Sequence, residues 1–185
     1  LIFAAGVAGL VAGAVSMALG EYVSVSTQRD TQRALLRQQR RQLADMPEAK
    51  LAELAAIYAA KGLSAQTARR VATELTNHDA LAAHAEAELG IDPDDLSNPW
   101  QAAMSSAFSF TFGALIPLIA ILLPPAELRL PVAFASVVVA LMLTGTLSAM
   151  LGGARKGRAV VRVVLGGALA MLVTYGIGQL VGPSL

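Results

Sequence analysis

Residues 6–30 read "GVAGLVAGAVSMALGEYVSVSTQRD", and they change from an apolar to a polar sequence within a few positions. About 20 apolar residues allow an α-helix to cross the hydrocarbon core of a bilayer, and residues 1–23 supply such a run. Met17 and Glu21 stand four positions apart near the end of this run, so a helix places both side chains on one face. The stretch therefore predicts a transmembrane helix over 1–23 with a carboxylate at its polar end.

The composition of the whole chain agrees with a membrane protein. Of the 185 residues, 55% are hydrophobic and only 15% are charged, which is too apolar for an ordinary soluble domain. A net charge of +1 gives no basic surface for nucleic acid, and the lack of cysteine excludes disulfides and thiolate chemistry. Residues 100–185 contain three more apolar blocks of membrane-spanning length, over about 101–123, 131–153 and 159–182. We therefore predict an all-α integral membrane helical bundle.

Residues 24–99 form a polar segment between the first two apolar blocks, and we call this segment the inserted domain. Its sequence favours short helices. Pro47 marks a break between two of them, and Ser64 precedes "AQTARRVATELT" as a candidate N-cap. Asn77 or Asp79 can cap the start of "ALAAHAEAELG". The pattern predicts a helical domain inserted between transmembrane helices.

The loops between the apolar blocks indicate the orientation in the membrane. The loop 154–158 carries three basic residues, whereas the loop 124–130 has only Arg129, which Glu127 offsets. Because basic residues concentrate in cytoplasmic loops, the first loop is predicted to be cytoplasmic and the second external. Counting the spans backward predicts that residues 24–99 are also cytoplasmic. We expect an integral protein of the bacterial inner membrane.

Met17 and Glu21 are the first candidates for a functional site. A carboxylate near the membrane boundary is costly unless it faces water, a partner or a cavity. Its oxygens supply negative charge to a metal ion, and a thioether beside it adds preference for transition metals over Ca²⁺ and Mg²⁺. The alternative is that the methionine packs against a neighbour and the glutamate is an interfacial charge. The spacing alone leaves both interpretations open.

The opening stretch resembles the second transmembrane helix of the vacuolar iron transporter family. The similarity continues in order through "PEAKLAELAAIYAAKGL", "TNHDALAAHAEAELGI", "FTFGALIPLIAILLP" and "GGALAMLVTYGIGQLVG". It implies a dimer whose subunits have five transmembrane helices each, with a cytosolic helical domain after the second. It also implies transport of Fe²⁺, and often Mn²⁺, out of the cytosol in exchange for protons. The four blocks then match helices two to five, so we expect the chain to be a fragment without the family's first helix and its aspartate.

The resemblance also implies where the inserted domain would bind metal. Three positions that are glutamates in the family are not carboxylates here: Gln39, Gln42 and Lys50. Glu53 and Glu88 remain, and His84 stands as a substitute ligand. We expect the inserted domain to bind Mn²⁺ weakly or not at all, because one cation and two neutral groups replace three anions. The metal-ligating candidates of the chain are Met17, Glu21, Glu53, His84 and Glu88.

The leading hypothesis is a divalent metal transporter that exchanges Fe²⁺ or Mn²⁺ for protons, since metal and proton compete for the same carboxylate. The alternative is a family member with a degenerate metal site that acts as a structural or regulatory membrane protein. We see no catalytic constellation and expect no enzyme. We expect no resident cofactor, with Fe²⁺, Mn²⁺ or Zn²⁺ as cargo. The expected partners are the lipid bilayer and a second copy of the chain, packed through the small face at Gly6, Gly9 and Gly13, and no nucleic acid.

Overall fold

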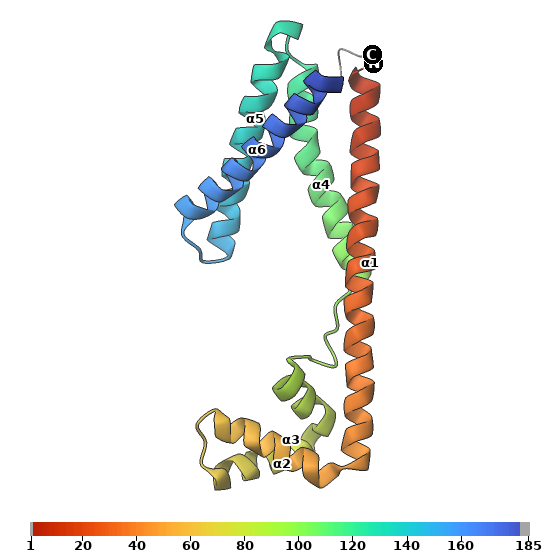
Figure 1. Cartoon of the computed structure of the whole chain (residues 1–185), viewed down its shortest axis with the longest axis vertical. Helices are drawn as coiled ribbons and strands as arrows, with labels where there is room; N and C mark the ends of the chain where they lie inside the picture. The colour runs from red at the N-terminus through yellow and green to blue at the C-terminus, as the bar shows by residue number, and fades with distance from the viewer. Residues whose placement is uncertain (1, 182–185) are drawn as a thin grey trace. The chain divides into compact units, whose positions relative to one another are not determined.

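The computed structural model describes residues 2–181, and within this range the regular elements are all helices (Figure 1). The all-α prediction is confirmed. The elements are α1 (Ile2–Asp45), α2 (Pro47–Ala60), α3 (Ala65–His84), the π-helix η1 (Ala85–Leu89), α4 (Pro99–Leu122), the 3₁₀-helix η2 (Ala126–Leu128), α5 (Arg129–Leu151) and α6 (Lys156–Val181).

Helix α1 runs for 44 residues without a break, so the predicted first span and the first helix of the inserted domain are one element. No glycine or proline lies between Gly20 and Pro47. The Thr27 hydroxyl donates to the Val23 carbonyl at 2.9 Å, so this polar side chain is satisfied inside the helix. The helix ends because Met46 precedes a proline, which disfavours helical backbone, and Met46 adopts φ −139° and ψ 58°.

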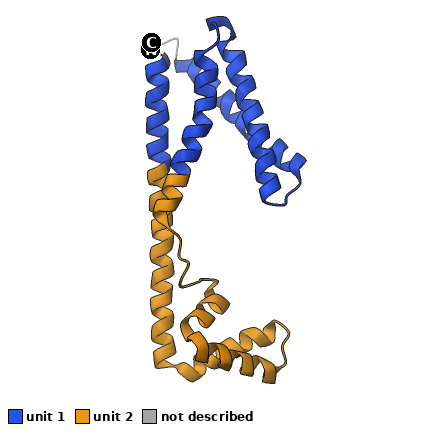
Figure 2. Cartoon of the chain, turned by 180° about the vertical axis from the view of Figure 1, so that it is seen from behind, with its two compact units in different colours: residues 1–17, 106–185 blue, residues 18–105 orange. Residues whose placement is uncertain are grey.

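The chain divides into two compact units (Figure 2). One contains the described residues up to Met17 and from Ser106 onward, and the other contains residues 18–105. The second unit includes the whole inserted domain together with a few residues on either side.

Four helices of the described chain are long and apolar enough to cross a membrane, as the sequence predicted: α1, α4, α5 and α6. Helices α5 and α6 pack side by side as a hairpin (Figure 1). Their close approach needs a small residue, because a Cβ added at Gly145 would lie 3.0 Å from the Val160 Cα. Large apolar side chains such as Leu147 and Leu165 are exposed, which suits contact with lipid.

The glycines of α1 do not all face the same surroundings. A Cβ added at Gly13 would overlap the Phe110 ring of α4, and one at Gly6 would overlap the Leu118 side chain of the same helix. Gly9 has open space around it. Two members of the predicted dimer face, Gly6 and Gly13, therefore pack within the chain, and Gly9 is the member that remains open.

The inserted domain has a small apolar core and ordinary helix caps. Leu36 of α1 packs with Ala85 of η1 and with Ile91. The Ser64 hydroxyl accepts a hydrogen bond from the Thr67 amide at 3.2 Å, as its predicted capping role requires. Asp79 interrupts α3 with φ −152° and ψ 98°, and its carboxylate accepts from the Ala82 amide at 2.9 Å. Of the two predicted cap candidates, Asn77 and Asp79, Asp79 is the residue that caps the helix.

Candidate functional site

A buried lysine lies at the centre of the polar cluster in the inserted domain. Lys50, in the first turns of α2, has its Nζ atom 2.6 Å from Glu53 Oε2 and 2.6 Å from Glu88 Oε2. Only 5% of Lys50 is exposed. The positive end of a helix dipole disfavours a cation near a helix N-terminus, so the two carboxylates, and not the helix, hold the ammonium in this place.

Glu88 receives hydrogen bonds from three side chains. Its Oε2 atom accepts from Gln39 Nε2 at 2.8 Å and from Lys50 Nζ, while His84 Nδ1 lies 2.6 Å from its Oε1 atom. Burial by itself raises the pKa of Glu88, but the hydrogen bonds from Lys50, His84 and Gln39 outweigh it, and the pKa falls below its ordinary value. Glu88 is therefore an ionised carboxylate whose accepting positions are largely filled.

His84 has a defined role in this arrangement. An ionised carboxylate only accepts hydrogen bonds, so Nδ1 of His84 carries the proton shared with Glu88. The side chain is fully buried, and its Nε2 atom has no hydrogen-bond partner among the described residues. In this geometry His84 positions the Glu88 carboxylate through a hydrogen bond, and His84 itself is not part of the wall of the neighbouring cavity.

The ammonium of Lys50 is charged as well. Burial by itself lowers the pKa of Lys50, but the hydrogen bonds to Glu53 and Glu88 outweigh it, and the pKa rises above its ordinary value. One cation thus lies between two anions in a mostly buried place. The ion pair with Glu53 is partly in solvent, because half of the Glu53 side chain is exposed.

A cavity of about 270 Å³ opens beside the cluster. Polar and charged side chains make up much of its wall: Gln38, Gln39, Gln42, Lys50, Glu53 and Glu88. Gln39 and Gln42, which stand where the family has glutamates according to the resemblance, line the same cavity as Glu53 and Glu88. Sequence reasoning missed that Lys50 bonds both remaining carboxylates, although its alignment to a ligand position was the available signal.

The cluster does not fit a divalent ion as it stands. No group of three or more His, Asp or Glu side chains within residues 2–181 is placed to hold a metal. The predicted ligands Glu53, His84 and Glu88 come from α2, the end of α3 and η1, and the structure does bring them into one hydrogen-bonded cluster. Their lone pairs, however, are directed at protein donors.

Met17 and Glu21 form the second candidate site, and their surroundings are different. Both lie on the uninterrupted helix α1, and both side chains are exposed. Within the described part of the chain, no side-chain hydrogen bond or ion pair to Glu21 is present. Nearby, the Tyr22 and Trp100 rings pack with centroids 5.0 Å apart, an aromatic pair of the kind that occurs at membrane interfaces.

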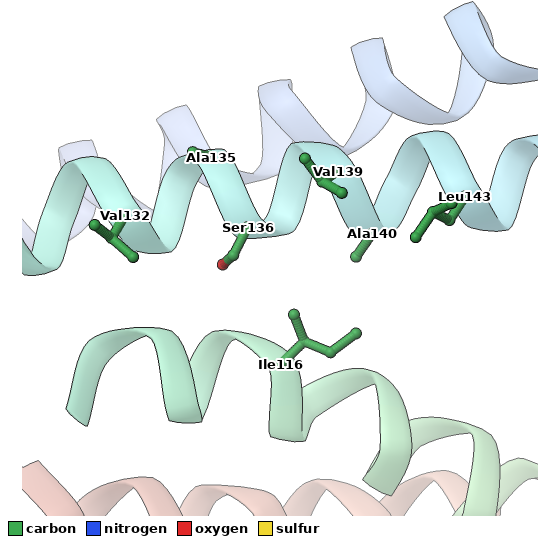
Figure 3. A pocket seen from close by; sticks show the side chains of 7 residues that line it. All are labelled: Ile116, Val132, Ala135, Ser136, Val139, Ala140 and Leu143. Atoms are coloured by element: carbon green, nitrogen blue, oxygen red, sulfur yellow. The ribbon is translucent and has the colours of Figure 1, made fainter. Parts of the chain in front are cut away.

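A groove between α4 and α5 offers no ligand for an ion. Figure 3 shows Ile116 of α4 opposite a row of small and aliphatic side chains of α5. Ser136 is the polar member of this lining, and its hydroxyl donates to the Ala133 carbonyl at 2.8 Å. The groove is therefore apolar and suits lipid or another apolar helix.

Known proteins match this chain along almost its whole length. A family model described as "VIT family" matches residues 1–179. A vacuolar iron transporter of Acanthamoeba castellanii is 39% identical over 180 residues, which cover 97% of this chain and 69% of that protein.

Two plant proteins show similar coverage. "Vacuolar iron transporter homolog 2.1" of Arabidopsis thaliana is 33% identical over 96% of this chain and 65% of its own length. "VIT-like transporter 1b" of Glycine max is 34% identical over 97% of this chain and 62% of its own length. The chain thus spans about two thirds of the length of these curated relatives. Their names are those of transporters, in agreement with the prediction that the chain is not an enzyme.

Proposed function

Because the chain belongs to the VIT family, we propose that the protein it forms transports a divalent transition metal across a membrane. The proposed cargo is Fe²⁺ or Mn²⁺, moved out of the cytosol in exchange for protons. The membrane-spanning helices support this proposal, and so do the iron-transporter names of the relatives. The proposed location is the bacterial inner membrane, with the inserted domain on the cytoplasmic side.

The Glu21 carboxylate is the observation that carries the proposal. It is exposed on a helix of membrane-spanning length, and no described side chain neutralises it. An ionisable group near the membrane boundary is costly unless it faces water, a partner or a cavity. A free carboxylate binds either a proton or a metal ion, so one group can couple the two fluxes. The Met17 thioether, one helical turn earlier, supplies the softer ligand.

Transport by the full-length protein in proteoliposomes tests this proposal. A metal-quenched dye and a pH dye inside the vesicles report the two fluxes together. We expect Glu21→Gln to abolish metal-driven proton flux, because it removes the exchangeable charge and nearly keeps the shape. The matched control is Glu127→Gln, which removes another exposed carboxylate, from η2. Wild-type flux in Glu21→Gln would refute the assigned role.

The role of Met17 needs a milder change. Met17→Leu keeps the volume and removes the sulfur, so we expect an altered preference among Fe²⁺, Mn²⁺ and Zn²⁺ with normal expression. Met150→Leu is the control, since Met150 is an exposed methionine of α5. An identical metal preference in both variants would place Met17 outside the transport path.

A second candidate function is that of a structural or regulatory membrane protein that no longer handles metal. The cluster around Lys50 favours this candidate, because a protein cation lies between the carboxylates of the inserted domain. The same vesicle assay separates the two functions. Absence of flux in the wild-type protein, under conditions in which the Acanthamoeba castellanii transporter is active, would select the second.

The topology and the dimer are parts of the same proposal. The chain has no native cysteine, so single cysteines at Gly62 and Ala126 can be labelled separately. We expect labelling from opposite sides of the membrane, and same-side labelling would overturn the topology. We also propose a homodimer, which crosslinking in the membrane tests. Detection of monomer alone would count against it.

A further inference from the structure

The position of Lys50 is unusual for a lysine in a helical domain. Its side chain is almost entirely buried, although the long side chain would reach water from most surface positions. Burial of a charge is costly unless it is paired and hydrogen-bonded. Both conditions are met here, because the ammonium contacts Glu53 and Glu88 at 2.6 Å.

The contacts of Lys50 link separate elements of the inserted domain. The lysine and Glu53 belong to α2, and Glu88 belongs to η1. Gln39 of α1 donates to the same Glu88 oxygen as the lysine. The ammonium thus lies at the meeting point of three elements, and it neutralises carboxylates that would otherwise repel each other.

We propose that Lys50 is a tethered cation that occupies the cation site of the inserted domain, so that this domain holds its structure without metal and excludes divalent ions. The ammonium supplies positive charge where the two carboxylates converge. A metal ion would have to displace it and break the bonds that Glu88 accepts. The inference concerns the inserted domain alone, and it stands whether or not the proposed transport is correct.

Removal of the tethered charge should open the site to metal. In Lys50→Gln the two carboxylates lose the ammonium between them, while Gln39, His84 and the introduced amide remain as neighbours. Removal of one charge near the site should tighten Mn²⁺ binding at least about tenfold, even after strong screening of the interaction. The helical fold of this variant should then become metal-dependent.

The test uses the full chain purified in detergent and followed by circular dichroism during heating, with EDTA or with MnCl₂. Bound manganese is measured by elemental analysis after desalting. We expect the wild type to show the same unfolding midpoint in both media and to retain no manganese that the Glu88→Gln change removes. In EDTA, Lys50→Gln should unfold at a lower midpoint temperature than the wild type. In MnCl₂ its midpoint should rise again, and it should retain manganese after desalting. Lys50→Arg keeps the charge and should behave as the wild type.

Two further variants control this experiment. Lys61→Gln removes an exposed lysine at the end of α2 and should gain no metal response. The double variant Lys50→Gln, Glu88→Gln should lose the manganese that Lys50→Gln gains, which assigns the metal to this cluster.

The proposal has clear contrary outcomes. It fails if the wild type retains manganese and Glu88→Gln removes it, or if a folded Lys50→Gln shows no metal response. If Lys50→Gln does not fold in either medium, the decision rests on the wild type and Lys50→Arg. Manganese binding at Glu88 in either protein would then overturn the proposal, and metal-independent folding of both would support it.

Discussion

Glu88 of the inserted domain and Glu21 of α1 are both carboxylates with a predicted metal role, yet their surroundings are opposite. Glu88 is mostly buried and accepts hydrogen bonds from Lys50, His84 and Gln39. Glu21 is exposed and has no described partner. The comparison shows that residue type alone does not make a metal ligand. A carboxylate whose lone pairs already bind protein donors stabilises the fold, whereas an unpaired one keeps its lone pairs free.

The largest difference between Glu88 and Glu21 is expected in the loss of stability when each is truncated. Glu88→Ala leaves Lys50 buried with only the half-exposed Glu53 as counter-ion, and we expect a loss of about 3–5 kcal/mol in the inserted domain. Glu21→Ala should stay within about 0.5 kcal/mol, as at other exposed positions. Hydrogen exchange of α2 and η1 peptides measures both changes. Equal effects would remove the distinction between the two sites.

Acid weakens the same contacts without removing a side chain. The lowered pKa of Glu88 means that its contribution to stability is complete above its ordinary value of 4.5 and is lost as pH falls through the folded-state pKa. The pKa of Lys50 is shifted in the opposite direction. Its contribution to stability is therefore complete below its ordinary value of 10.5 and is lost as the pH rises through the raised folded-state pKa. We therefore expect a stability plateau between these values and an acid decline.

The Glu88→Gln variant checks the origin of that decline. The η1 amides of this variant should exchange faster than those of the wild type at neutral pH. Their exchange should also change less when the pH is lowered. An unchanged acid dependence would assign the decline to other carboxylates.

The glycines of α1 allow a similar comparison inside the membrane. Gly13→Leu forces a side chain into the Phe110 ring, and overpacking of this kind costs about 1–3 kcal/mol. Gly9→Leu meets open space and should leave the fold of the monomer unchanged. Thermal unfolding in detergent measures both. If only Gly9→Leu reduces crosslinked dimer at normal stability, the dimer face includes Gly9.

The smallest expected effect concerns the kink in α3. Asp79→Ala removes the acceptor for the Ala82 amide, and loss of an N-cap costs about 1 kcal/mol. This kink precedes His84 and η1, so the change should raise hydrogen exchange there. Asn77→Ala is the control, because Asn77 is the neighbouring cap candidate that the structure does not use. Equal effects would show that Asp79 does not act as a cap.

Much of the fold could be predicted because its signals are local. The four spans follow from apolar blocks of sufficient length, and the cap at Ser64 follows from one residue type before a helical pattern. The break between α1 and α2 follows from Pro47. The continuity of α1 through residue 23 was missed, since a change from apolar to polar sequence does not by itself end a helix.

The membrane character of the chain, its helices and the residue types at the candidate sites follow from the order of its amino acids. How those residues contact one another depends on the packing of the helices. Glu53, Lys50 and Glu88 lie up to 38 positions apart, and their charges alone could not show whether the lysine would retreat into solvent or enter the cluster. The packing of α1, α2 and η1 decided it, because a buried carboxylate in this place requires a cation and Lys50 is within 2.6 Å. Likewise, Gly13 and Gly9 lie on the same helix, but Gly13 is next to Phe110 of α4 and Gly9 has open space around it. This difference depends on the position of α4 and cannot be read from the two glycines.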